Sequence, residues 1–154
     1  MRTSIRLLAP VLFSLLALAC SGTPPKTTGT SLAPCPDKPN CWSSLSPDEE
    51  HRTEPLQLAG ERGWAALRDA VAAMPRTKIV EDRPGYLHAE WTSRIFGFVD
   101  DLELLRGAGD RVDVRSASRV GYGDQGVNKA RIQALRDALA ARGALPSTAG
   151  ATAK

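Results

Sequence analysis

Residues 102–114 read LELLRGAGDRVDV, two segments of alternating apolar and polar side chains on either side of a glycine-rich turn. Successive side chains of a β-strand point to opposite faces, so Leu102 and Leu104 share one face of the first strand. Val112 and Val114 share one face of the second. A short turn rich in glycine typically joins antiparallel strands. The stretch therefore predicts a β-hairpin with one apolar face.

The register of this hairpin has a consequence for two charged residues. If Leu104 pairs with Val112, Asp101 comes to lie opposite Arg115 on the neighbouring strand. Opposite charges facing each other across two strands stabilise a sheet. This register predicts a structural role for the Asp101–Arg115 pair.

Further patterns flank the hairpin on both sides. Apolar residues predict a strand that begins at Ile79 and another over residues 86–93. Apolar residues three and four positions apart predict helices over 61–74 and 127–142, the second capped by a left-handed Gly143. The order of helix, strands and helix predicts an α+β fold, with a small antiparallel four-stranded sheet and two helices on one face.

The first 19 residues predict a secretory signal. Arg2 and Arg6 precede an apolar run of 13 residues, which is shorter than the roughly 20 that a membrane-spanning helix needs. The run ends at Ala19-Cys20, which resembles a bacterial lipobox, in which diacylglycerol alkylates the cysteine. The alternative is an ordinary signal peptide with a stray cysteine. We expect lipid attachment at Cys20, because the alternative leaves an odd thiol among three cysteines of an exported protein.

Lipidation would make a membrane the first partner, since two or more acyl chains hold a protein firmly on a bilayer. By resemblance to sorting in bacteria with two membranes, Ser21 favours the outer membrane, facing the periplasm, over the inner membrane. Residues 20–34 are predicted to be a lipidated disordered tether, 35–142 a single domain, and 143–154 a disordered tail. Without residues 1–19 the net charge falls to +1, which argues against general nucleic-acid binding.

Cys35 and Cys41 lie six positions apart across a turn rich in proline. In an oxidising envelope this spacing predicts an N-terminal disulfide loop. Zinc is the alternative, but two cysteines with only His51 nearby are too few ligands, so no metal site is predicted. A redox role would require the closer C-x-x-C spacing.

Residues 121–126 read GYGDQG and match the glycine pattern of dinucleotide-binding folds. That fingerprint needs a following parallel strand and an acidic residue about 20 positions later. No acidic residue follows Asp137, and Asp124 would repel a pyrophosphate. We expect no cofactor here, and we expect the motif to supply turns and a helix N-cap at Asp124 or Gly126.

Candidates for catalysis are few. Ser116 or Ser118 assisted by His88 would form a nucleophile and base, since such groups meet only in space. No recognised hydrolase or metalloprotease motif accompanies them. The sequence therefore favours a protein that is not an enzyme.

The densest polar chemistry lies where the last strand feeds a glycine loop and a helix. Free backbone amides and guanidinium groups in such a place can bind an anion. The alternative is a buried network of arginine, aspartate and asparagine that fixes the loops. The candidate ligand-binding set consists of Arg94, Arg115, Ser116, Ser118, Arg119, Tyr122, Asp124, Asn128 and Arg131.

Three blocks in the same order resemble a bacterial family, the domain of unknown function numbered 1499. They are PCPDKPNC at 34–41, SRIFGFVDD at 93–101, and RSASRVGY at 115–122 followed by Asp124, Gly126-Val127-Asn128 and Arg131-Ile132. The likeness runs from about residue 33 to 139. It implies a shared fold and an envelope context, and it brings no catalytic residue.

Together these features predict a cell-envelope lipoprotein that acts as a non-catalytic module. Its ligand would be an anionic small molecule, a lipid or glycan group, or an envelope protein, held by the candidate set. One alternative is a hydrolase or transferase that acts on envelope material through Ser116 or Ser118 with His88. The other is a purely structural scaffold.

Overall fold

The computed structural model describes residues 22–27 and 30–146. The predicted signal peptide, Cys20 and residues 147–154 lie outside this part. The elements are β1 (Cys41–Ser43), η1 (Glu49–His51), β2 (Leu56–Gln57), α1 (Gly63–Ala72), β3 (Thr77–Arg83), β4 (Tyr86–Thr92), β5 (Val99–Arg106), η2 (Ala108–Asp110), β6 (Arg111–Ser118) and α2 (Val127–Ala141). The predicted α+β class is confirmed.

The sheet is antiparallel and has six strands in the described residues, whereas the sequence predicts four. Strands β3 to β6 are the expected ones, in the spatial order β6-β5-β4-β3. The two additional strands, β1 and β2, both pair with β6 and have only three and two residues. Strands so short carry too few side chains for an alternating pattern to be detected. They form because the edge of β6 that does not pair with β5 is free to pair with them.

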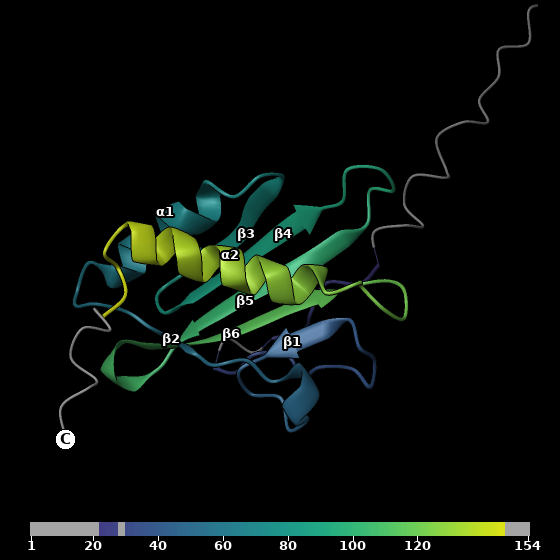
Figure 1. Cartoon of the computed structure of the whole chain (residues 1–154), viewed down its shortest axis with the longest axis horizontal. Coiled ribbons are helices and arrows are strands. Elements are labelled where there is room, and N and C mark those ends of the chain that lie inside the picture. Colours follow the sequence, from purple (N-terminus) through teal and green to yellow (C-terminus); the bar gives the residue numbers. More distant parts are fainter. Residues whose placement is uncertain (1–21, 28–29, 147–154) are drawn as a thin grey trace, which may run out of the picture.

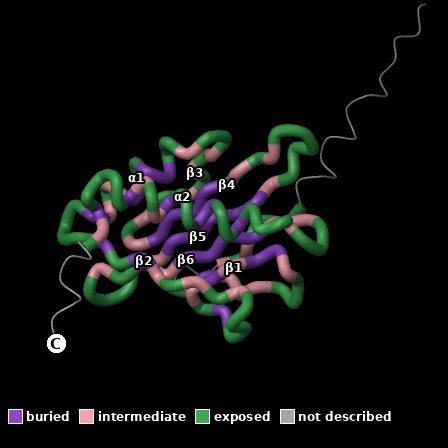
Figure 2. Tube along the Cα trace, viewed as in Figure 1, coloured by how far each residue is buried: buried purple, intermediate pink, exposed green. Residues whose placement is uncertain are grey.

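Both helices cover one face of the sheet (Figure 1). The core lies between them and strands β4 to β6, where buried positions run along the middle of the sheet (Figure 2). Leu67 and Val71 of α1 and Leu135 of α2 are fully buried there against Leu87, as the helical and strand periodicities predict. The expected cap is present too, since Gly143 is left-handed with φ of 62°.

The hairpin register differs from the predicted one by two residues. Leu104 pairs with Val114, and Glu103 rather than Asp101 lies opposite Arg115. The reason is the turn, which is centred on the left-handed Gly109 and lengthened by η2. A shift of two residues keeps every side chain on its face, so the apolar pattern holds while the charge pairs change.

Both ends of the predicted domain extend further than composition indicates. Leu32, in the predicted disordered tether, is only 6% exposed. Ala144, in the predicted disordered tail, is 5% exposed and accepts a hydrogen bond from the amide of Ala59. One apolar residue with a place to pack is enough to anchor a polar segment, and composition does not detect it.

Candidate functional site

The sheet face opposite the helices carries a network of buried charged side chains. His88 on β4 lies 2.7 Å from Asp101 on β5, measured from Nε2 to Oδ1. Arg119, directly after β6, donates to both carboxylate oxygens of Asp101 and also to Glu90 at 2.5 Å. The side chains of Asp101 and Arg119 are 4% and 5% exposed. This group is called the open-face network below.

The network continues along the sheet through Glu103, which is fully buried. Arg115 donates from Nη1 to Oε2 of Glu103 at 2.7 Å, and the Tyr86 hydroxyl donates to Oε1 at 3.1 Å. Burial, followed by the negative charge of Glu103, raises the pKa of Tyr86, so this phenol stays protonated and remains a donor. Glu103 therefore holds a tyrosine and an arginine together.

The pKa values of the Asp101–Arg119 pair show how strongly the two groups interact. Burial by itself raises the pKa of Asp101, but the hydrogen bonds from His88 and Arg119 and the charge of Arg119 outweigh it and hold the pKa below its ordinary value. The pKa of Arg119 is raised above its ordinary value, mainly by the hydrogen bond to Asp101. Both groups are thus kept charged.

The open-face network is not positively charged. Glu90, Asp101 and Glu103 carry three negative charges against the two positive charges of Arg115 and Arg119. Three carboxylates already occupy much of the arginine hydrogen-bonding capacity. An anion therefore gains little attraction from this face.

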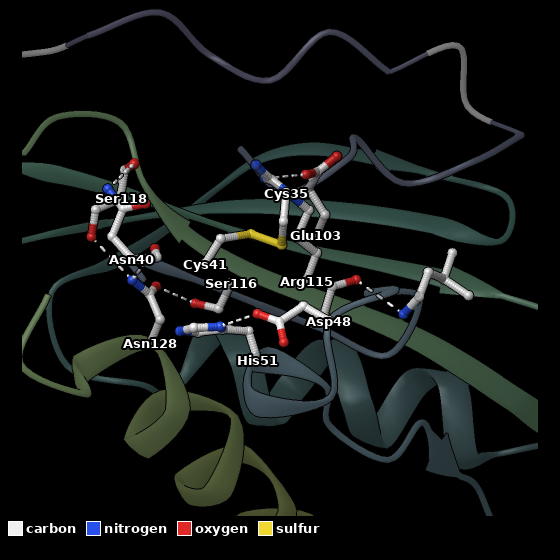
Figure 3. The surroundings of a disulfide bond; sticks show 12 residues. Cys35, Asn40, Cys41, Asp48, His51, Glu103, Arg115, Ser116, Ser118 and Asn128 are labelled. Atoms are coloured by element: carbon white, nitrogen blue, oxygen red, sulfur yellow. Dashed lines mark hydrogen bonds and ion pairs between the residues drawn. A yellow bond between two sulfur atoms is a disulfide. The ribbon is translucent and has the colours of Figure 1, made fainter. Parts of the chain in front are cut away.

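A cleft of about 400 Å³ lies over part of this face. Asp101, Arg115 and Arg119 line it from the sheet, together with Ala117 and Ser118. The other wall is the chain segment before β1, which crosses the sheet on the side away from α2 (Figure 3). That wall consists of Thr23, Pro25, Ala33, Pro34, Cys35 and Pro36.

Arg115 has unused donors beside this cleft. Its side chain is 8% exposed, and its one hydrogen bond to the described residues is the one from Nη1 to Glu103. The buried Nε has no partner there. Buried donors normally have a partner, because an unsatisfied one costs about 1–3 kcal/mol. The Arg115 guanidinium therefore keeps donors beside this cleft that no described residue uses.

The helix-covered face holds a second, separate network around Asn128 at the start of α2. Asn128 is fully buried, accepts from the Ser116 hydroxyl at 2.6 Å and donates to Ser118 at 3.0 Å. Its amide also donates to the backbone oxygen of Asn40 beside the disulfide (Figure 3). Of the two predicted N-cap residues, Gly126 holds that position, and Asp124 accepts from the Asn128 backbone amide at 2.8 Å. These contacts fix the glycine loop.

Arg131 belongs to this second network. It donates to Asp100 at 2.7 Å and to Ser116 at 2.8 Å, and its guanidinium lies over the ring of Trp91 at 4.6 Å. Burial lowers the pKa of Arg131 although Asp100 acts in the opposite direction. The Trp91 ring and the Asp100 carboxylate both contact the guanidinium of this buried arginine.

The predicted ligand-binding set is thus divided among three places. Arg115 and Arg119 lie in the open-face network, and five residues form the network at α2. Arg94 and Tyr122 are exposed in loops. The five at α2 are Ser116, Ser118, Asp124, Asn128 and Arg131.

The two halves of the predicted serine–histidine pair lie on opposite faces of the sheet. His88 is in register with Glu103, which is in register with Arg115, and cross-strand partners share a face. Ser116 is in register with Leu102, and the Ser118 hydroxyl accepts from Asn128, so both hydroxyl groups lie on the helix-covered face. Because the sheet separates them from His88, His88 cannot act as the base for either serine.

Sequence reasoning missed most of the open-face network, namely Tyr86, Glu90, Asp101 and Glu103 in a binding role. A signal was present, since Tyr86, His88 and Glu90 alternate with the apolar positions of β4. Only the pairing of β4, β5 and β6 shows that these side chains lie beside Asp101 and Arg119.

The predicted disulfide between Cys35 and Cys41 is confirmed. Its loop forms one wall of a second cleft, of about 410 Å³, with Asp48, His51 and Tyr122 on the other sides. A hydrogen bond from His51 is the main cause that lowers the pKa of Asp48. The exposed Tyr122 is the member of the candidate set that faces this cleft.

Within residues 22–27 and 30–146, no helix has the length and apolar character required to cross a bilayer. Nor does this part of the chain contain three or more His, Cys, Asp or Glu side chains grouped to hold a metal ion.

The geometry defines a class of protein: a disulfide-tied α+β domain whose sheet is apolar on the helix side and charged on the other. Residues 31–139 match the model of a family described as "Protein of unknown function (DUF1499)". The match covers more than two thirds of the chain, which therefore belongs to this family. Comparison with curated proteins finds no match, and comparison with solved structures finds none either.

Proposed function

We propose that this protein is a cell-envelope lipoprotein, held on a membrane by acylated Cys20, that binds a saccharide group without catalysis. The observation that carries the ligand assignment is Arg115, a buried arginine with unused donors beside a cleft. The attachment rests on the apolar run that ends at Ala19-Cys20. The outer membrane is favoured by Ser21.

The chemistry of the cleft favours an uncharged ligand over an anion. Asp101 supplies carboxylate oxygens, and Arg115 supplies donors within the same wall. A sugar ring presents neighbouring hydroxyl groups that both donate and accept, so it complements a carboxylate beside a guanidinium. The three carboxylates of the network, against two guanidinium groups, oppose a phosphate or carboxylate ligand.

Nuclear magnetic resonance of the arginine side chains tests the ligand. N-acetylglucosamine should shift the Arg115 Nε–H resonance saturably, and inorganic phosphate should leave it unchanged. Arg115→Lys keeps the charge but removes the forked donors. N-acetylglucosamine should then no longer shift the resonances of the other residues that line the cleft. Arg111→Lys, at an exposed position of the same strand, should leave these shifts unchanged. A response to phosphate alone would favour the anionic ligand instead, and no response to either would refute ligand binding at this cleft.

The attachment is tested separately by the mass of the mature N-terminal peptide from cells. Cys20 should carry diacylglycerol, and Cys20→Ala should release the protein from membranes. An unmodified mature N-terminus would refute the anchor and leave the cleft experiment unaffected.

A further inference from the structure

The loop between β4 and β5 presents large apolar side chains to solvent. Ile95 is 82% exposed, Phe96 is 68% exposed and Phe98 is 40% exposed. The other large exposed apolar residues of the described chain, such as Leu45 and Val80, are scattered over different elements. Single exposed apolar residues are ordinary, but three within four positions mark a contact surface.

The loop has a defined conformation that holds these side chains outward. The Ser93 amide donates to the Phe98 carbonyl at 2.8 Å, and the Phe98 amide donates to the Ser93 hydroxyl at 2.9 Å. Gly97, with φ of 66°, supplies the left-handed turn between the two phenylalanines. The rings of Phe96 and Phe98 stack with their centroids 5.4 Å apart. The surface formed by Ile95, Phe96 and Phe98 is called the apolar tip.

The described chain begins at the same end of the sheet. A methyl group on Gly22 would lie 2.5 Å from Cβ of Arg119, so the two residues are in contact. The amide of Arg119 donates to the carbonyl of Val99, the residue that follows Phe98. The loop lies at the end of β4 in Figure 1, where β5 begins and β6 finishes.

This placement limits where the acylated cysteine can be. Cys20 is two positions before Gly22 in the sequence, and two residue steps span at most about 7 Å. A lipid on Cys20 therefore enters the bilayer close to Arg119 and to the base of the apolar tip. The hairpin turn with Ala108 lies at the opposite end of β5 from this point.

We infer that the apolar tip is a second membrane contact, inserted into the bilayer interface beside the lipid anchor. Apolar side chains enter the boundary between headgroups and acyl chains, and the exposed Arg94 can keep its charged end at the phosphates. The inference rests on the proposed acylation of Cys20. It adds an orientation, with the tip down and the hairpin turn at Ala108 outward.

Fluorescence quenching by brominated lipid tests this in the acylated, full mature protein. Phe96→Trp places a reporter in the tip, and Ala108→Trp places the same reporter at the exposed far end of β5. In vesicles of phosphatidylethanolamine and phosphatidylglycerol brominated high in the acyl chains, the Phe96→Trp signal should be quenched at least about threefold more strongly, since an interfacial contact buries side chains by about 5–10 Å. The quenching of the native Trp42, Trp64 and Trp91 is measured in the protein without a reporter and subtracted from that of both variants.

Flotation of the same vesicles separates the two proposals. Flotation with equal quenching of both reporters would overturn the inserted tip, point to a protein partner for it, and leave the anchor intact. Failure to float would overturn both. Adding Ile95→Ser and Phe98→Ser to the Phe96→Trp variant should remove the extra quenching while flotation by the acyl chains persists. Persistent quenching in that variant would also contradict the inference.

Discussion

Asp101 accepts two hydrogen bonds from the guanidinium of Arg119, at 2.9 Å from Nε to Oδ2 and at 2.8 Å from Nη2 to Oδ1. Asp101 belongs to β5 and Arg119 directly follows β6, and they meet on the face without helices. Two-pronged pairing of this kind is both stronger and more specific in geometry than a single hydrogen bond. It fixes the point at which the chain leaves the sheet for the glycine loop.

This pair predicts a stability that depends on pH. Because the pKa of folded Asp101 lies below its unfolded value of about 3.9, its contribution is complete above that value and is lost as the pH falls toward the folded pKa. We expect the free energy of unfolding to decrease below about pH 4 in urea titrations. Asp101→Asn should flatten this dependence, and Asp110→Asn, at an exposed ion pair, should preserve it. Equal slopes in wild type and Asp101→Asn would contradict the assignment.

The buried pair of Arg131 and Asp100 predicts a strong energetic coupling. Arg131→Met should reduce the free energy of unfolding by about 3–5 kcal/mol, because it leaves Asp100 buried without its partner. Asp100→Leu in the same background should recover a large part of that loss, since no uncompensated charge is left. Urea unfolding of the two single variants and the double variant measures the coupling, and additive losses would mean that the pair is not coupled.

Asn128 should be more important for stability than any exposed polar residue of α2. Asn128→Ala removes hydrogen bonds to both serines and to the backbone of Asn40 and leaves buried groups unsatisfied. We expect a loss of about 2–3 kcal/mol in thermal or urea unfolding. Gln133→Ala, which removes a surface contact to Asp137 on the same helix, is the control and should change stability by about 0.5 kcal/mol or less. Similar losses for both variants would argue against the buried network.

The disulfide should stabilise the fold modestly. It closes a loop between residues only six positions apart, so the chain-entropy estimate of its contribution is about 2 kcal/mol. The double variant Cys35→Ala and Cys41→Ala should unfold at a correspondingly lower urea concentration. A reducing agent should shift wild type in the same direction and leave the variant unchanged, and a shift in the variant would point to another thiol.

Local sequence patterns were sufficient for the elements whose signals repeat over many residues. The alternation over residues 86–93 identified β4, and the spacing of Ile132, Leu135 and Leu139 identified α2, because each side chain follows directly from backbone periodicity. The short strands β1 and β2 could not be predicted in this way, since they exist only through pairing with β6.

The polar sites depended on tertiary structure. Arg115, Arg119 and Arg131 are near one another in sequence and looked like a single cluster, but strand alternation and the helix send them to opposite faces of the sheet. Their carboxylate partners, Glu103, Asp101 and Asp100, lie close together on β5. The hairpin register places Arg115 opposite Glu103, and the packing of α2 on the sheet brings Arg131 to Asp100.

The sequence by itself therefore determined the layers of this protein, its disulfide and its apolar core, because these follow from backbone period and from short separations along the chain. Only the tertiary structure decided which charges are paired, that His88 and Ser116 are separated by the sheet, and that Gly22 and the apolar tip share one end. The physical reason is that a hydrogen bond or an ion pair depends on distances of a few ångströms between residues far apart in the chain, and a two-residue change of register is enough to alter them.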